Sequence, residues 1–262
     1  MGLRIVTVDA FTDVPFAGNP AAVCVLPEPR DEAWMQSVAR EMNLSETAFL
    51  RKEEGGYSLR WFTPAVEVDL CGHATLASAH ALWEEGHVPA GRDIRFSTRS
   101  GALTAARDGV HIELDFPATP PAPCDAPEGL FASLGIAPRQ VLKSRFDYLV
   151  ELADEAEVRR LSPDHTGLRS LGVRGVMVTA RAEGAFDVVS RFFAPGAGID
   201  EDPVTGSAHC CIGPYWAERL GKAELRCFQA SARGGAMRVK VMGERVKLSG
   251  QAVTVMRGEL CF

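Results

Sequence analysis

A duplicated segment is the feature of this sequence that most restricts its fold. Residues 60–64 read Arg-Trp-Phe-Thr-Pro, and residues 191–195 read Arg-Phe-Phe-Ala-Pro, 131 positions later. Each copy is followed by an acid-containing stretch, a glycine, a small-residue run with helical spacing, a tryptophan and a closing glycine. These landmarks are Gly72, Trp83 and Gly86 in the first copy and Gly206, Trp216 and Gly221 in the second. Because the offset is half of the 262-residue chain, the repeat predicts two related domains.

A proline-rich stretch lies between the two copies. Residues 116–123 read Phe-Pro-Ala-Thr-Pro-Pro-Ala-Pro. Proline has no N–H group and a fixed φ angle, which suits a linker better than a strand or a helix. We therefore predict an N-terminal domain over 1–118 and a C-terminal domain over 119–262, with the last strand able to return to the first domain. Each half is long enough to bury a core of its own.

Local patterns predict an α+β architecture in both halves. In the first half, apolar and alternating runs predict strands over 4–10, 22–26, 44–50 and 57–63, and helices after Asp31 and over 73–85. In the second half they predict strands over 140–152, 175–179, 186–193, 236–241, 245–248 and 252–260, and a short helix over 163–170. We expect each half to be a barrel-like, mostly antiparallel sheet around one central helix.

Charge and composition exclude several classes of partner. The formal net charge of −6 and the scattered Lys and Arg residues disfavour a nucleic-acid partner, because an acidic surface repels phosphates. The first residues alternate like a strand and lack the basic start and long apolar stretch of a signal peptide, so we expect a cytoplasmic protein without a membrane partner. Seven cysteines without a CxxC pair predict reduced thiols.

The two repeated glycines mark candidate anion sites. Each precedes a small-residue helix, whose unpaired N–H groups and dipole favour a bound carboxylate. The segments concerned are Cys-Gly-His-Ala-Thr at 71–75 and Asp-Pro-Val-Thr-Gly-Ser at 202–207. Alternatively, the glycines only permit tight turns, while Thr75 and Ser207 satisfy first-turn donors. The repetition, with His73 and Asp202 nearby, favours the anion site.

Other ligand motifs are missing from the sequence. Neither glycine segment has the GxxxxGK[ST] spacing of a phosphate loop, and no HExxH motif occurs, so we predict neither a nucleotide nor a metal. We expect His80 and His209 to be buried helix residues rather than ligands.

Glu46, in Asn-Leu-Ser-Glu-Thr-Ala-Phe at 43–49, is the remaining candidate for acid–base chemistry. Burial among the neighbouring apolar residues would raise its pKa towards the range useful to a general base. An exposed strand glutamate is the commoner case, and the local pattern alone favours it.

Taken together, the motifs resemble one family. They comprise the segments 8–13, 16–20, 43–49, 71–75, 202–209 and 229–235. The set resembles the phenazine biosynthesis PhzF-like family, which has the diaminopimelate epimerase fold, and it covers nearly the whole chain. The resemblance implies a homodimeric, cofactor-independent isomerase with a site between two similar domains. It would move a proton between carbons of a cyclic dihydro-hydroxyanthranilate.

The resemblance also implies roles for individual residues. Glu46 is expected to transfer the proton, while His73 and Asp202 would hold the substrate and assist. Gly206 and Ser207 would donate hydrogen bonds to its carboxylate, and Gly72 and Ala74 would line the site. Related epimerases use a pair of cysteine bases, but here only the first copy keeps a cysteine, Cys71, to which we assign no catalytic role. Two alternatives remain: an amino-acid epimerase using Glu46 with another base, and a carboxylate-binding protein without turnover.

Overall fold

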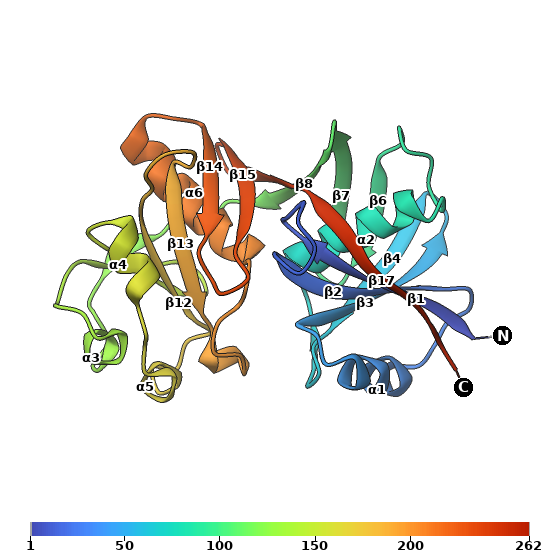
Figure 1. Cartoon of the computed structure of the whole chain (residues 1–262), viewed down its shortest axis with the longest axis horizontal. Helices are drawn as coiled ribbons and strands as arrows, with labels where there is room; N and C mark the ends of the chain where they lie inside the picture. Colours follow the sequence, from blue (N-terminus) through green and yellow to red (C-terminus); the bar gives the residue numbers. More distant parts are fainter. Residues whose placement is uncertain (1, 262) are drawn as a thin grey trace. The chain divides into compact units, whose positions relative to one another are not determined.

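The computed structural model describes residues 2–261 (Figure 1). The chain divides into two compact units, the first formed by Met1–Asp115 with Ser249–Phe262 and the second by Phe116–Leu248. The break after residue 115 comes three residues before the boundary predicted from the prolines. Strand β17 (Ala252–Leu260) falls in the first unit because it pairs antiparallel with β1 (Leu3–Ala10) along its length.

Unit 1 is built on a curved run of strands. β1 also pairs with β2 (Asn19–Leu26), which runs parallel to β3 (Glu46–Glu53). β3 pairs antiparallel with β4 (Gly56–Phe62), and β4 pairs in turn with the short β5 (Glu67–Val68) and with β6 (Ile94–Thr98). The remaining strands, β7 (Gly101–Asp108) and β8 (His111–Pro117), continue by antiparallel pairing.

Helix α2 (Gly72–Glu84) is the core of unit 1. All of it except His80 and Glu84 is buried, and it packs against β1, β2, β3 and β17. A helix that is apolar and small on every side can be enclosed in this way. Helix α1 (Glu32–Met42) instead packs outside, on β3 and β4, and buries only Met35 and Ala39 (Figure 1).

Unit 2 contains a similar set of strands around its own central helix. In chain order they are β9 (Ala122–Cys124), β10 (Val141–Lys143), β11 (Tyr148–Glu151), β12 (Val176–Arg181), β13 (Val188–Phe193), β14 (Glu224–Gln229), β15 (Gly235–Met242) and β16 (Arg245–Gly250). The helices are α3 (Leu130–Leu134), α4 (Glu155–Arg160), α5 (His165–Arg169), the 3-10 turn η1 (Pro195–Ala197) and α6 (Gly206–Leu220). The pairs β11–β12 and β13–β14 are parallel, and β12–β13 and β14–β15 are antiparallel.

The central helix of unit 2, α6, contains a proline. Pro214 cannot donate to the carbonyl of Cys210, which would leave that buried acceptor unpaired. The backbone N–H of Thr119, in the proline-rich stretch, donates to this carbonyl at 3.0 Å. Beside it, a Cβ on Gly213 would lie 2.5 Å from a methyl group of Val239, so the glycine allows α6 to pack closely on β15. The proline-rich stretch thus supports α6 rather than serving only as a linker.

Several local predictions were wrong. Residues 140–152 form two strands, β10 and β11, because Ser144 and Asp147 make a turn in which the Ser144 N–H donates to the Asp147 carbonyl at 2.9 Å. Helices α3 and α4 were not predicted. Both units also contain parallel pairs, but most of the described strand pairs are antiparallel, as predicted. Within 2–261, the helices are all too short or too polar to cross a bilayer.

Candidate active site

The start of helix α2 brings Glu46 and His73 together. Glu46 is the first residue of β3, and His73 is the second residue of α2, which packs on that strand. The carboxylate Oε2 of Glu46 lies 3.0 Å from Nε2 of His73, and the two side chains are 16% and 5% exposed. Both atoms are buried, and apart from this mutual contact neither has a hydrogen-bond partner among the described residues.

The other nitrogen of His73 faces polar neighbours too. Its Nδ1 lies 3.1 Å from the side-chain amide of Asn19 and 3.5 Å from the sulfur of Cys71. With the amide nitrogen of Asn19 donating to Nδ1, the neutral ring carries its proton on Nε2, towards Glu46. A doubly protonated ring would require the Asn19 amide to turn its oxygen to Nδ1. The imidazole is thus oriented so that its exchangeable proton meets the carboxylate.

Electrostatics favours the charged form of His73. Burial alone would lower its pKa, but the negative charges that Cys71 and Glu46 can place beside the ring outweigh burial and raise the pKa well above the usual value. Burial, and next the charge of Glu46, raises the pKa of the Cys71 thiol. Cys71 at Nδ1 and Glu46 at Nε2 are thus the two acidic neighbours that favour the imidazolium.

Glu46, His73 and Cys71 also form a candidate metal site. One ligand atom each of Glu46, Cys71 and His73 lies within 4.8 Å of the others, a grouping that the sequence did not predict. However, Glu46 faces Nε2 of the imidazole and Cys71 faces Nδ1. An ion bound to Nε2 would lie away from Cys71, and an ion bound to Nδ1 would lie away from Glu46. The arrangement suits movement of a proton through the ring better than coordination of an ion.

The first turn of α2 presents backbone donors. Cys71 precedes the helix in an extended conformation and makes no side-chain cap, and the first turn holds no acidic residue. The first helical hydrogen bond at this end runs from the Thr75 N–H to the Cys71 carbonyl, at 3.2 Å. The N–H groups of Gly72, His73 and Ala74 precede it, where a helix has no carbonyls of its own to offer. These positions include two of the predicted binding residues.

The start of helix α6 in unit 2 is built from different side chains. The Thr205 hydroxyl donates to the Asp202 carboxylate at 2.5 Å, and the Gln229 amide accepts from the Thr205 N–H at 2.9 Å. The same Gln229 donates to the Asp202 carbonyl at 2.6 Å. All three residues are buried, so this network fixes the backbone on which Gly206 and Ser207 begin the helix.

Two further histidines were predicted to be buried helix residues. His209 is fully buried and contacts the Thr205 carbonyl at 2.8 Å, and burial lowers its pKa to about 4, so it is a neutral core residue. His80 is instead partly exposed, with Nε2 3.2 Å from the Thr254 hydroxyl and 3.5 Å from Glu84. It lies near the end of α2, where the helix reaches the surface.

The predicted residues thus form two groups. Glu46, Gly72, His73 and Ala74 lie in unit 1, and Asp202, Gly206 and Ser207 lie in unit 2. Sequence reasoning gave no role to Asn19, Thr205 or Gln229, which contact these groups. All three occur inside the motifs that carry the family resemblance, and that is the signal by which they could have been found.

Comparison with known proteins identifies relatives over the full length. The sequence profile of the phenazine biosynthesis-like protein family matches residues 8–258. A protein of Halalkalibacterium halodurans, named an uncharacterized isomerase, is 55% identical over 99% of both chains. The crystal structure of a PhzF-family protein from Enterococcus faecalis superimposes with a TM-score of 0.95 at 41% identity and covers 100% of each chain.

A more distant structure shows how widely the fold is shared. A hydroxyproline epimerase from Agrobacterium vitis, solved with bound trans-4-hydroxy-L-proline, has a TM-score of 0.68 at 13% identity, over 98% of this chain and 92% of that one. At this identity the likeness concerns the fold alone, and it confirms the predicted epimerase-like architecture. The family match and the shared name of its relatives complete the identification: the chain belongs to the phenazine biosynthesis-like family and is an isomerase.

Proposed function

We propose that this isomerase moves a proton on carbon of a small carboxylic acid without a cofactor, with Glu46 as the base and His73 as its acid partner. The observation that carries the proposal is the buried contact of 3.0 Å between the two side chains at the start of α2. At this contact Glu46 offers a carboxylate oxygen that can accept a proton, beside an imidazole nitrogen that can donate one.

The reaction follows from this arrangement of acid and base. Glu46 accepts a proton from a substrate C–H bond, and the electron pair of that bond moves into the conjugated system of the substrate. Glu46 then returns the proton to another carbon, so the overall change is an isomerisation without gain or loss of electrons. His73, through its Nε2 proton, stabilises the negative charge that develops nearby. A buried site limits loss of the proton to water.

The groups in unit 2 are proposed to hold the substrate. The N–H groups of Gly206 and Ser207, at the start of α6, suit a carboxylate. Asp202, oriented by the Thr205 hydroxyl, suits an amine or hydroxyl group. A cyclic acid of the dihydro-hydroxyanthranilate kind offers all these groups, as the family resemblance implies. The ligand of the hydroxyproline epimerase is likewise a small cyclic amino acid.

Two further expectations belong to this proposal. The family resemblance supports a homodimer. All seven cysteines are free thiols, five of them buried, which suits the reducing cytoplasm. Size-exclusion chromatography with light scattering checks the first expectation, and fractionation of the source cells checks the last.

Isotope exchange tests the proposal. Wild-type protein is incubated in D2O with dihydro-hydroxyanthranilate and a panel of amino and cyclic carboxylic acids, and deuterium uptake is followed by NMR. Glu46→Gln should abolish uptake while keeping the fold and ligand binding. Glu53→Gln is the matched control, because Glu53 lies at the other end of β3 and pairs with Arg51 instead of a histidine. Equal uptake in wild-type and Glu46→Gln protein would refute the assignment of the base.

The same assay separates the alternatives. Deuterium at the α-carbon of one amino acid, with inversion, would indicate an epimerase that uses Glu46 with another base. A two-thiol mechanism is disfavoured, because Thr205 stands before α6 where Cys71 stands before α2. A folded wild-type protein that binds carboxylates but exchanges none of them would indicate a binding protein.

A further inference from the structure

Both central helices are preceded by a glutamate at the same distance. Glu67 lies five residues before Gly72, and Glu201 lies five residues before Gly206. We call residues 67–71 and 201–205 the lead segments, because they run from each glutamate into the helix. The lead segment of unit 1 ends two residues before His73, and the lead segment of unit 2 contains Asp202 and Thr205.

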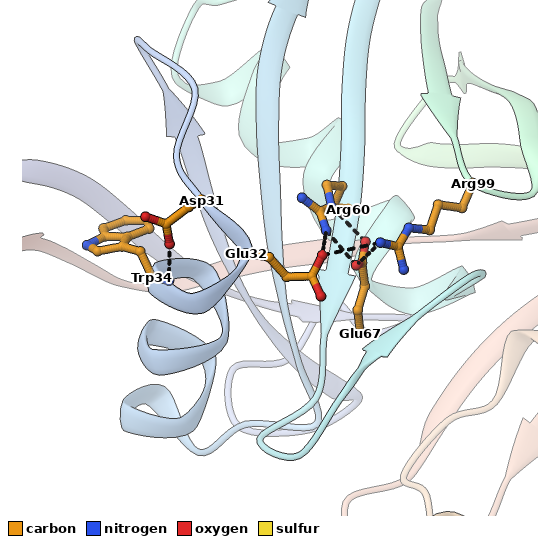
Figure 2. Close-up of polar contacts among 6 residues, drawn as sticks. All are labelled: Asp31, Glu32, Trp34, Arg60, Glu67 and Arg99. Carbon is orange, nitrogen blue, oxygen red and sulfur yellow. Dashed lines mark hydrogen bonds and ion pairs between the residues drawn. The ribbon is translucent and has the colours of Figure 1, made fainter.

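In unit 1, an arginine of the repeated motif holds the glutamate of the lead segment. Arg60 on β4 donates to both carboxylate oxygens of Glu67, at 2.7 and 2.6 Å, and Arg99 reaches the same carboxylate at 2.6 Å (Figure 2). Glu32, which follows the α1 cap at Asp31, completes the network at 2.7 Å from Arg60. The side chain of Glu67 is only 5% exposed, so this carboxylate depends on its arginine partners.

In unit 2, the equivalent arginine does the same. Arg191 on β13 donates to both carboxylate oxygens of Glu201, at 2.7 and 2.9 Å. Its remaining nitrogen donates to the carbonyl of Leu161, at 2.6 Å, at the C-terminal end of α4. The guanidinium groups of both arginines lie over the aromatic ring two residues later, Arg60 over Phe62 at 5.1 Å and Arg191 over Phe193 at 4.8 Å.

The two copies differ in length between the arginine and the glutamate. The arginines are 131 positions apart, whereas the glutamates and the helix-starting glycines are each 134 apart. The additional residues of the second copy are accommodated where the 3-10 turn η1 follows β13. The chain therefore changed length outside the lead segment, while the ion pair and the five-residue spacing to the helix stayed the same. Loop length does not set the position of the helix start, but the arginine–glutamate pair can.

The chemistry of the pair suits such a task. Two parallel N–H···O bonds between a guanidinium and a carboxylate fix both distance and orientation, which a lysine ammonium cannot do. Stacking on Phe62 or Phe193 further restricts the arginine. A residue fixed in this way is only a few residues from the first helical turn, so its position constrains where the helix begins.

We propose that Arg60 and Arg191 are positioning residues that, through Glu67 and Glu201, fix the starts of α2 and α6. This inference rests on the proposed function for its catalytic consequence, because it holds that the arginines place His73 and Asp202 for reaction. Its structural half concerns the helix starts alone and is tested without a substrate.

The test is hydrogen exchange of backbone amides in the whole protein. The reporters are the N–H groups of Thr75 and His209, which make the first helical hydrogen bonds to Cys71 and Thr205. Arg60→Gln should speed exchange at Thr75 about tenfold beyond any change at the core amide of Leu50, and leave His209 unchanged. Arg191→Gln should do the reverse. Arg60→Lys should accelerate exchange at Thr75 by an intermediate amount. It replaces Arg60→Gln in the test if the glutamine variant does not fold.

Arg139→Gln is the matched control. Arg139 makes the same two-bond contact with Glu157, at 3.1 and 2.9 Å, but that pair joins no lead segment. It should lower the melting temperature without accelerating Thr75 or His209 selectively. The inference would be overturned if, in each of Arg60→Gln, Arg191→Gln and Arg139→Gln, the exchange rates of Thr75 and His209 changed by the same factor.

Turnover provides the second readout. In the deuterium-uptake assay, Arg60→Gln should lower kcat at least tenfold relative to Arg139→Gln, with a smaller change in KM. If both Arg60→Gln and Arg191→Gln kept the wild-type kcat, the inference would be overturned while the proposed function stayed intact. Selective acceleration at the helix starts, with no uptake by the wild-type protein, would refute the proposed function and leave the structural half of the inference standing.

Discussion

The starts of α2 and α6 have the same backbone arrangement but carry different side chains. Each helix begins at a glycine after an extended residue that makes no side-chain cap, and each lead segment is held by a repeated arginine. At α2 the neighbouring groups are a carboxylate and an imidazole that can exchange a proton. At α6 they are a hydroxyl, a primary amide and a carboxylate joined by hydrogen bonds. Duplication has thus preserved the backbone and allowed the side chains to diverge.

The histidines of the two helices show what this divergence does. His73 faces Glu46 and has a raised pKa, whereas His209 faces the Thr205 carbonyl, and burial lowers its pKa to about 4. Both are buried, so burial alone does not decide the charge. The neighbouring acidic groups, Cys71 and Glu46, do, and they make the start of α2 the site at which proton transfer is proposed.

The largest expected effect separates the two histidines by kinetics. His73→Gln should lower the rate of deuterium uptake by about two to four orders of magnitude, because it removes the proposed acid, while His209→Gln should change it by less than about threefold. Uptake rates of the two folded variants, with circular dichroism as the check on folding, provide the comparison. A similar loss in both would remove the distinction between the helices.

The second effect concerns the pH dependence of stability. His209 stays neutral in the fold, whereas the unfolded chain takes up a proton below about pH 6.5, so folding should lose roughly 3 kcal/mol as the pH falls from 6.5 to 4. His209→Gln should lack this loss. His73 has the opposite sign: its stabilising contribution is full below about pH 6.5 and is lost as the pH rises through its raised pKa.

Urea unfolding of the wild type and both histidine variants at several pH values measures these slopes. Parallel pH profiles in wild-type and His209→Gln protein would show that this histidine is charged in the fold. A wild-type profile that rises above pH 6.5 relative to His73→Gln would contradict the sign assigned to His73.

A smaller effect is expected from the network at α6. Gln229→Ala removes the acceptor of the Thr205 N–H and a donor to Asp202, and leaves buried groups unpaired. The free energy of unfolding should fall by about 1–3 kcal/mol. Denaturant midpoints measure the loss, and NMR should show the His73 ring unchanged. An altered His73 titration in this variant would mean that the chemistry of α2 depends on this network.

The smallest effect is expected at Cys71. Its thiol is neutral and packs at the start of α2, so Cys71→Ala should change stability by less than about 1.5 kcal/mol and leave deuterium uptake nearly unchanged. Thermal melts and the uptake assay check both statements. A hundredfold loss of uptake would give this thiol a chemical role that it lacks in the present account.

The sequence predicted the central helices better than the smaller strands and helices. The repeat indicated both central helices, and the helix expected over 73–85 is observed over Gly72–Glu84. The split of 140–152 into two strands was missed because a turn made by Ser144 and Asp147 has no glycine or proline to mark it. Helix α4 did carry a signal, since Asp154 caps the N–H of Glu157 and Glu157 accepts from Ala153.

The site was harder to predict than the fold. Glu46 and His73 are 27 residues apart, and their contact depends on how α2 packs on β3, which no local pattern contains. The family motifs named both residues, but not Asn19 or Gln229 as their neighbours. The equivalence of Glu67 and Glu201 was hidden because the repeat offset changes from 131 to 134 between the arginine and the glutamate.

The titration of the His73 ring tests the central claim most directly, since it needs no substrate. With histidine rings labelled and His73→Gln used for assignment, NMR should show His73 titrating above 6.5 in the wild type. In Glu46→Gln it should titrate at least about one pH unit lower, because the neighbouring carboxylate is gone. A wild-type His73 that titrates at or below 6.5, or one that ignores the loss of Glu46, would contradict the account.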